Sequence, residues 1–81
     1  MGILLSTAFV LINARIGSQD QILKDLQKIL GVDTAYSSHG VYDLIVKVQA
    51  DSLDKLKELI FHHIRQIHNV HATLTLTVTE E

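Results

Sequence analysis

The order of secondary structure implied by the hydrophobic periodicity is the feature that most constrains how this chain folds. Residues 8–16 are apolar at nearly every position, which is typical of a central strand buried on both faces. Residues 42–50 and 70–79 alternate apolar and polar side chains, a period of two that places one set on a core. Apolar residues at helical spacing follow the first predicted strand and again the third. Each half of the chain is therefore predicted to form a strand, a helix and a second strand.

The first helix is predicted to begin at Ser18 and to end at Gly31. Ser18 and Gln21 have the spacing of a capping box, in which the serine hydroxyl meets a free backbone amide and the glutamine reaches back. Gly31 takes the left-handed conformation that closes a helix without a steric penalty. The apolar face is expected to hold Ile22, Leu23, Leu26, Ile29 and Leu30. Residues 32–38 are more polar and predict an edge strand.

A second helix is predicted after Asp51 and Ser52, which offer an N-cap. Its apolar face is expected to hold Leu53, Leu56, Leu59, Ile60, His63, Ile64 and Ile67. Phe61 lies well off this stripe at about 100° per residue and is expected to point outward. There it is either a single exposed aromatic side chain or a contact between dimers.

The order of elements along the chain, β-α-β-β-α-β, predicts an α+β fold, and the chain has no proline and only short connections. Right-handed crossovers then produce a four-stranded antiparallel sheet with two helices on one face, the ferredoxin-like βαββαβ sandwich. A chain of 81 residues suits one domain over residues 1–81 with a modest core.

The other face of this sheet has no helix to cover it. If Ala8, Val10 and Ile12 point to the helices, then Phe9, Leu11 and Ile45 are expected on the open face, together with the threonines of the last strand. Such an apolar patch is typical of an interface, and 47% hydrophobic residues is high for a small chain. The pattern predicts a sheet-to-sheet dimer, with a covering partner protein as the alternative.

Charge and composition argue against several classes of partner. The formal charge is −2, and the seven Lys and Arg residues are dispersed, so direct nucleic-acid binding is not expected. The absence of cysteine removes disulfides and thiolate catalysis and fits a reducing, cytoplasmic location. The apolar N-terminus has no basic region and is interrupted by Ser6 and Thr7, so neither a signal peptide nor a membrane span is expected.

Five histidines raise the question of a metal site. No pair of them has the i, i+4 spacing that presents two imidazoles on one helical face to one ion. Solvated or packed histidines are therefore expected in place of a metal site, and no cofactor is expected.

Two motifs carry a resemblance to a known family. They are "HGVYDLIVKV" at residues 39–48 and "NVHATLTLTV" at residues 69–78, in this order within the predicted fold. Over about residues 7–79 the chain resembles the effector-binding RAM domain of the Lrp/AsnC family, the leucine-responsive and asparagine-synthesis regulators. Members of that family join this domain to an N-terminal helix-turn-helix. None precedes the domain here, so a stand-alone effector domain is expected.

The resemblance implies that small amino-acid effectors bind in clefts where dimers meet. The residues carried over are Gly40, Tyr42 and Asp43, with Thr73, Thr75 and Thr77 as weaker candidates. Ser37, Ser38 and His39 are expected to line the same cleft, where departures from the family change which effector fits or prevent any from binding. Gly40 is expected to permit a tight turn and a close approach. Asp43 is expected to accept hydrogen bonds from a ligand ammonium while turn amides bind the carboxylate. The alternative is structural, because an aspartate that opens a strand can bond to backbone amides.

The expected function is a non-enzymatic, self-assembling module that binds a small amino acid or related metabolite. It is expected to form dimers and higher assemblies such as an octamer, and to act on transcription through full-length Lrp/AsnC-type regulators. One alternative is a cofactor-free enzyme with Tyr36, Tyr42 and His71 in a cavity. No spacing of nucleophile and base, phosphate loop or acidic cluster supports it. A structural interaction module without a ligand is the other alternative.

Overall fold

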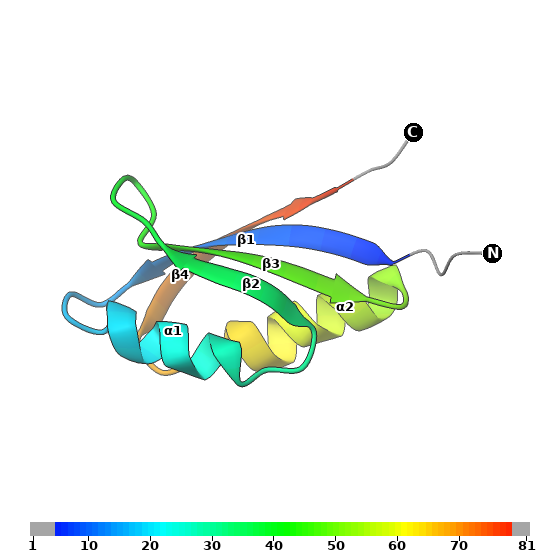
Figure 1. Ribbon diagram of the computed structural model, residues 1–81, viewed down its shortest axis with the longest axis horizontal. Coiled ribbons are helices and arrows are strands. Elements are labelled where there is room, and N and C mark those ends of the chain that lie inside the picture. The colour runs from blue at the N-terminus through cyan, green and yellow to red at the C-terminus, as the bar shows by residue number, and fades with distance from the viewer. Residues whose placement is uncertain (1–4, 79–81) are drawn as a thin grey trace.

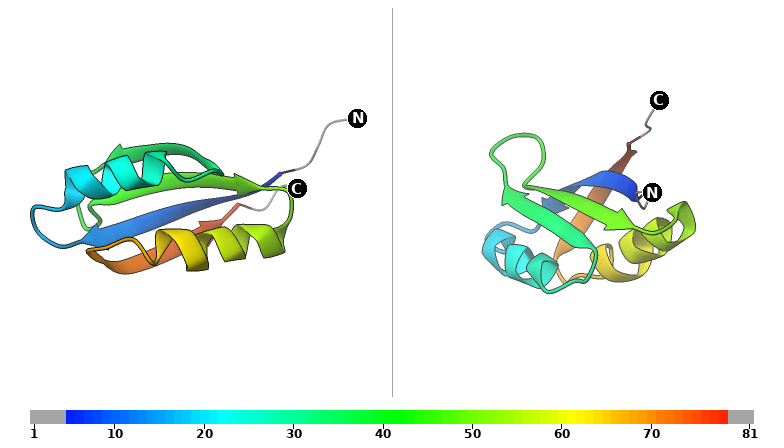
Figure 2. Two further views of the ribbon diagram at one scale, coloured as in Figure 1. Left: turned by 90° about the horizontal axis from the view of Figure 1, so that it is seen from below. Right: turned by 45° about the vertical axis from the view of Figure 1, so that its right-hand side comes forward.

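The computed structural model of the protein describes residues 5–78. The elements are β1 (Ser6–Ala14), α1 (Gln19–Gln27), β2 (Val32–Ser37), β3 (Leu44–Ala50), α2 (Leu53–Leu59), the π-helical turn η1 (Ile60–Ile64) and β4 (Val70–Thr77). The strands form one antiparallel sheet in the order β2-β3-β1-β4, and both helices lie on the same face of it (Figures 1 and 2). The predicted α+β architecture is confirmed. Thr79, the last residue of the predicted alternation, lies outside the described residues.

The core lies between the two central strands and the helices. Val10 stands opposite Val46, and Ile12 stands opposite Leu44, and all four side chains are fully buried. The helical layer contributes Ile22, Leu26, Leu56, Ile60 and Ile64. Each fully buried Val, Leu or Ile side chain contributes about 1.5–3 kcal/mol. Within residues 5–78, no helix is long and apolar enough to cross a membrane.

The two helices begin differently, and the capping box predicted at Ser18 is wrong. The Ser18 hydroxyl donates to the Arg15 carbonyl at 2.6 Å. Its backbone, at φ −101° and ψ 0°, is not extended, so the hydroxyl is not directed at the first free amides of α1. Gln21 donates instead to Asp25 at 3.0 Å. Ser52 is extended, and its hydroxyl accepts from the Lys55 amide at 3.2 Å, which confirms the N-cap of α2.

The position at which α1 ends shows that one residue of its predicted apolar face is not buried. The helix ends at Gln27, and the following turn leads to Gly31 at φ +101°, the left-handed conformation expected of that glycine. Leu30 lies in this turn and is 96% exposed, so its placement on the buried face is wrong. The helical period no longer applies to Leu30, because the chain has already left the helix.

The π-helical turn follows from the spacing of the buried residues of the second helix. Leu56, Ile60 and Ile64 are separated by four residues each and are all buried. At 3.6 residues per turn, a spacing of four drifts around an α-helix, and the wider i→i+5 turn offsets that drift. The Arg65 amide accordingly donates to the Ile60 carbonyl at 3.0 Å. The same turn directs His63 to solvent, so its predicted place on the apolar stripe is wrong.

Strand β4 also differs from the prediction, because its threonines do not share the open face with Phe9 and Leu11. Thr73 stands opposite Ile12, and Thr75 stands opposite Val10, which places both threonines on the helix side of the sheet. The open face instead receives the alternate residues of β4, Leu74 and Leu76, opposite Leu11 and Phe9. Alternation with a period of two separates the residues of a strand into two faces, but it does not indicate which of the two faces the helices cover. β4 is an edge strand, and α2 lies beside its helix-side face.

Substitution of the glycines tests this account of the turns. A Cβ on Gly31 would lie 2.8 Å from Leu59 Cδ2 and 3.2 Å from the Gln49 carbonyl oxygen, at a positive φ. We expect Gly31→Ala to lower the free energy of unfolding by about 2–4 kcal/mol. Gly17→Ala, at φ +87° in open space, should cost about 1 kcal/mol. Urea denaturation measures both, and equal losses for the two variants would contradict the predicted clash.

Candidate ligand-binding site

The loop over residues 38–43 joins β2 to β3 and projects from the sheet on the side away from the helices (Figure 1). His39, Gly40 and Val41 are exposed, while Tyr42 and Asp43 are half-buried. Gly40 does not have a positive φ, and no heavy atom lies within 4 Å of a Cβ built on it. The expected tight glycine turn is therefore wrong, because the loop is long enough to reverse the chain without one.

Asp43 is the centre of a hydrogen-bond network at the base of this loop. Its amide donates to the Ile12 carbonyl, and its Oδ2 accepts from the Ala14 amide, each at 2.8 Å. Its carbonyl accepts from the Ser38 amide at 2.8 Å and also from Gln19 Nε2. Gln19 donates to the Ser38 carbonyl as well, at 3.2 Å. Asp43 thus links the end of β1, both ends of the loop and the start of α1.

The position of Asp43 explains why a strand opens with a carboxylate. The pairing of β1 with β4 is irregular between Asn13 and Ala14. At this point Asp43 Oδ2 satisfies the Ala14 amide, which is the structural role that an aspartate at a strand end can take. Within residues 5–78, Oδ1 of Asp43 accepts no hydrogen bond. One carboxylate oxygen therefore supports the sheet, and the other is free to accept a further donor.

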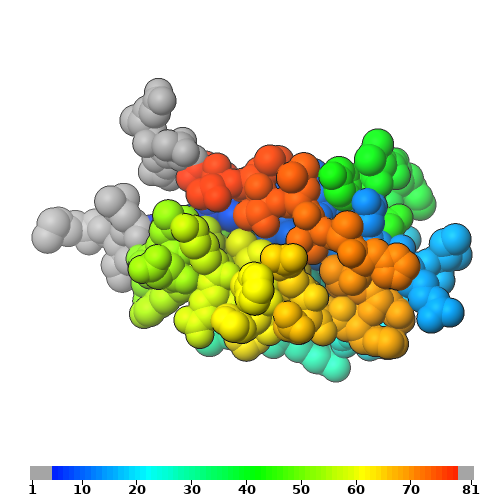
Figure 3. All heavy atoms as spheres, turned by 180° about the vertical axis from the view of Figure 1, so that it is seen from behind, coloured from blue at the N-terminus to red at the C-terminus, as the bar shows by residue number. Residues whose placement is uncertain are grey.

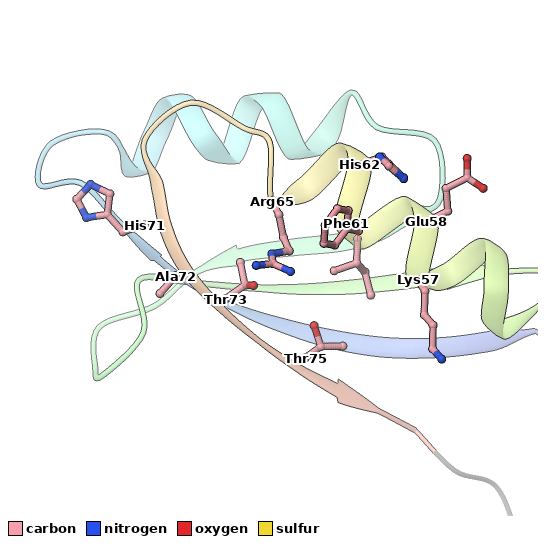
Figure 4. Close-up of a pocket in the computed structure, with 10 residues that line it drawn as sticks. Lys57, Glu58, Phe61, His62, Arg65, His71, Ala72, Thr73 and Thr75 are labelled. Carbon is pink, nitrogen blue, oxygen red and sulfur yellow. The ribbon is translucent and has the colours of Figure 1, made fainter.

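The predicted threonines lie elsewhere. Thr73 and Thr75 line a groove of about 740 Å³ between β4 and the outer face of α2 and η1, together with Phe61 and Arg65 (Figure 4). Atoms of β1 are visible between β4 and α2 on this side of the molecule (Figure 3). Thr77 stands opposite Ala8, toward the other end of β1, and is not among the residues that line this groove. A single chain therefore does not bring the six candidate residues into one pocket.

Phe61 contacts two other residues of the groove, Arg65 and His62. The Arg65 Cζ lies 5.0 Å from the centroid of the Phe61 ring, and the Phe61 and His62 rings make an edge contact at 5.3 Å. Phe61 is 52% exposed, which confirms that it points outward. Sequence reasoning did not single out Arg65, although its i, i+4 spacing from Phe61 was a signal that the two side chains share a face.

The histidines and tyrosines of the described residues are spread over the molecule's surface and sheet edges. All five histidines are exposed, and no three His, Asp or Glu side chains there are grouped to hold a metal ion. Tyr36 lies on β2 and His71 on β4, which are the opposite edges of the sheet. The enclosed cavity that the enzyme alternative requires is therefore not formed by Tyr36 and His71.

The open face of the sheet carries a continuous apolar row, defined by Leu74, Leu11, Ile45 and Tyr36. These residues stand opposite one another across all four strands. The next row runs from Leu76 and Phe9 to Lys47 and Thr34, and Lys47 forms an ion pair with Asp33 at 3.7 Å. Leu74 and Leu76 are 44% and 50% exposed. The apolar surface is thus concentrated over β1 and β4.

Substitution of Asp43 separates its structural role from its charge. Asp43→Ala leaves the Ala14 amide without its acceptor, so we expect the free energy of unfolding to fall by about 1–2 kcal/mol. Asp43→Asn keeps a side-chain oxygen in place and should recover most of that loss. Urea denaturation of both variants measures the difference. Wild-type stability in Asp43→Ala would contradict the structural role.

The comparison with family models identifies one family, and similar proteins and structures cover most of the chain. Residues 7–81 match the family model described as the Lrp/AsnC ligand binding domain. An uncharacterized HTH-type transcriptional regulator of Pyrococcus abyssi is 32% identical over an aligned region of 83 positions, and the match covers 94% of this chain and 55% of that protein. The crystal structure of a hypothetical protein from Pyrococcus horikoshii is 33% identical with a TM-score of 0.87, covering 96% of this chain and 93% of that one.

A more distant structure shares the fold. It is a transcriptional regulator from Neisseria meningitidis in complex with L-Met, 14% identical with a TM-score of 0.82, and the match covers 94% of this chain and 51% of that one. The chain spans about half the length of the curated relatives that it matches. The match to the family model extends over nearly the whole chain, and the protein belongs to the family of the Lrp/AsnC ligand binding domain.

Proposed function

We propose that this domain is a self-assembling effector-binding module. It pairs with a second copy through the open face of the sheet, and it binds a small amino acid or related metabolite near the loop over residues 38–43, where such pairs meet. It acts on transcription through regulators of its own family. The family description as a ligand-binding domain and the regulator names of the curated relatives support this class of function.

One observation carries the pairing, and it is the direction of the side chains on β4. Leu74 and Leu76 point away from the helices, whereas Thr73 and Thr75 point to the helix side. A strand directs its apolar set to the face that is more deeply buried in the functional state. For β4 that face is the open one, so a second sheet is needed to cover it.

The apolar row has the extent that such a pairing requires. Leu74, Leu11, Ile45 and Tyr36 span four strands, about 15 Å at the usual strand spacing. Sheets that pack face to face bury their apolar sides at about 10 Å separation. Phe9 and Leu76 extend the patch along β1 and β4. A surface of this kind is more typical of an interface than of a free monomer.

The chemistry of the loop suits a zwitterion. Asp43 Oδ1 accepts no hydrogen bond within the described part of the chain and can accept one from an α-ammonium group. The loop projects on the open-face side of the sheet, the side on which the second copy packs (Figure 1). The L-Met complex of the Neisseria meningitidis regulator supports an amino acid as the class of ligand.

A thermal-shift screen against the common amino acids tests the ligand. A ligand at about 100 times its Kd stabilises the fold by about 2.7 kcal/mol, which raises Tm by roughly 10–20 °C in a domain of this size. We expect at least one amino acid to raise Tm in the wild type and to lose the effect in Asp43→Asn.

The matched control for that screen is Asp33→Asn, which removes a carboxylate from β2 that pairs with Lys47. This variant should keep the ligand-induced shift, because Asp33 lies outside the loop over residues 38–43. If no amino acid raises the Tm of the wild-type protein, the ligand proposal fails and a purely structural module is favoured.

A further inference from the structure

We propose that Gln19 positions the loop over residues 38–43 for its ligand and couples that loop to the start of α1. The coupling rests on the proposed function, since it concerns the same ligand, and it adds how that site is regulated. The two coupled parts lie on different sides of the sheet, because α1 packs on the helix side and the loop projects on the other (Figure 1).

Between its two ends the loop is held by no hydrogen bond of its own. Residues 39–42 neither donate nor accept one within the described part of the chain. Val41 is 86% exposed, and no heavy atom lies within 4 Å of a Cβ built on Gly40. The conformation of the loop is therefore set at its base, by the contacts of Ser38 and Asp43.

The two ends of the loop are fixed by different partners. The Ser38 amide donates to the Asp43 carbonyl at 2.8 Å, which closes the base. Asp43 is also bound to β1, through the Ile12 carbonyl and the Ala14 amide. The Ser38 carbonyl accepts from Gln19 Nε2 at 3.2 Å, and the same nitrogen donates to the Asp43 carbonyl. Among the described residues, Gln19 makes the only hydrogen bonds between the helical layer and this loop.

The turn before α1 places Gln19 at the base of the loop. Ser18 is buried, and its amide and hydroxyl donate to the Arg15 carbonyl at 3.0 Å and 2.6 Å. Gln19 follows directly as the half-buried first residue of α1. A glutamine amide carries two N–H donors, so a single side chain can serve both carbonyls of the base.

Holding the loop in this way raises its affinity for a ligand. An amino acid that binds Asp43 Oδ1 and the free loop amides requires one loop conformation, and a loop already held in it loses less freedom on binding. Linkage is reciprocal, so the ligand strengthens the Gln19 bonds by the same factor. The first turn of α1, in which the Ile22 amide donates to the Ser18 carbonyl, is stabilised with them. Occupancy of the loop is thus transmitted to the helix side of the sheet.

The test is hydrogen exchange of the full chain by NMR, first without ligand. Gln19→Met keeps the length of the side chain and removes both donors. We expect the Ser38 amide to exchange about tenfold faster in this variant, while the core amides of β1 and β3 exchange as in the wild type. The amino acid that raises Tm in the thermal-shift screen should bind about tenfold more weakly. It should slow exchange of the Ile22 amide in the wild type and not in Gln19→Met.

Gln21→Met is the matched control, because it makes the same change two residues later in α1. Gln21 is exposed and donates to Asp25 within the helix, so this variant should keep wild-type exchange in the loop and wild-type affinity.

The measurement without ligand separates this inference from the proposed function. If no amino acid binds the wild type, the proposed function fails; a faster Ser38 amide in Gln19→Met would then leave Gln19 as a support of the loop and overturn its coupling to a ligand. The positioning role is overturned if the Ser38 amide exchanges equally in Gln19→Met and the wild type, or if Gln21→Met accelerates it as much. It is also overturned if the ligand binds Gln19→Met as tightly as the wild type.

Discussion

The register between β1 and β3 is the constraint on which the rest of this structure depends. Val10 opposite Val46 and Ile12 opposite Leu44 place four fully buried side chains on one face of the sheet. Because side chains alternate with a period of two, a slip of one residue would transfer this set to the other face. The same register brings the end of β1 to Asp43, whose amide and carboxylate then bind Ile12 and Ala14.

Because the helices cover only one face of the sheet, the register also determines which side chains lie on the uncovered face. Both helices pack on one face, so Leu11 and Ile45, which are adjacent to the buried residues in sequence, are left on the other. β4 adds Leu74 and Leu76 to that face and directs its threonines to the helix side. The strand therefore presents an apolar surface on the open face, where we propose that a second sheet packs, and a polar surface on the helix side, where its threonines line the groove.

Much of the fold could be predicted from sequence because it is encoded by periodicity. The order of strands and helices, the edge position of β2 and the outward direction of Phe61 all follow from local spacing and were confirmed. The predictions were wrong at positions where contact with an element distant in sequence determines the direction of a side chain or the form of a helix. The side of the sheet that Thr73 faces depends on pairing with Ile12, and the π-helical turn depends on burying both Ile60 and Ile64.

Less of the candidate site could be predicted from the sequence, because its contacts join residues that are distant along the chain. A motif identified Asp43, but its bond to the Ala14 amide joins residues 29 positions apart. The conformation of the loop around Gly40 is set by its length and by the bonds at its base, and a glycine in sequence does not reveal this. The groove was missed because it is formed by a helix and a strand that only the tertiary structure brings together.

The mass of the protein in solution, measured by analytical ultracentrifugation at micromolar concentration, tests the central claim most directly. The chain of 9.1 kDa should sediment as a dimer or a multiple of it. Leu74→Lys, which places a charge on the open face, should shift the particle toward the monomer, whereas Thr75→Lys, one residue away on the helix side, should not. A wild-type monomer, or an equal response of the two variants, would contradict the pairing of open faces.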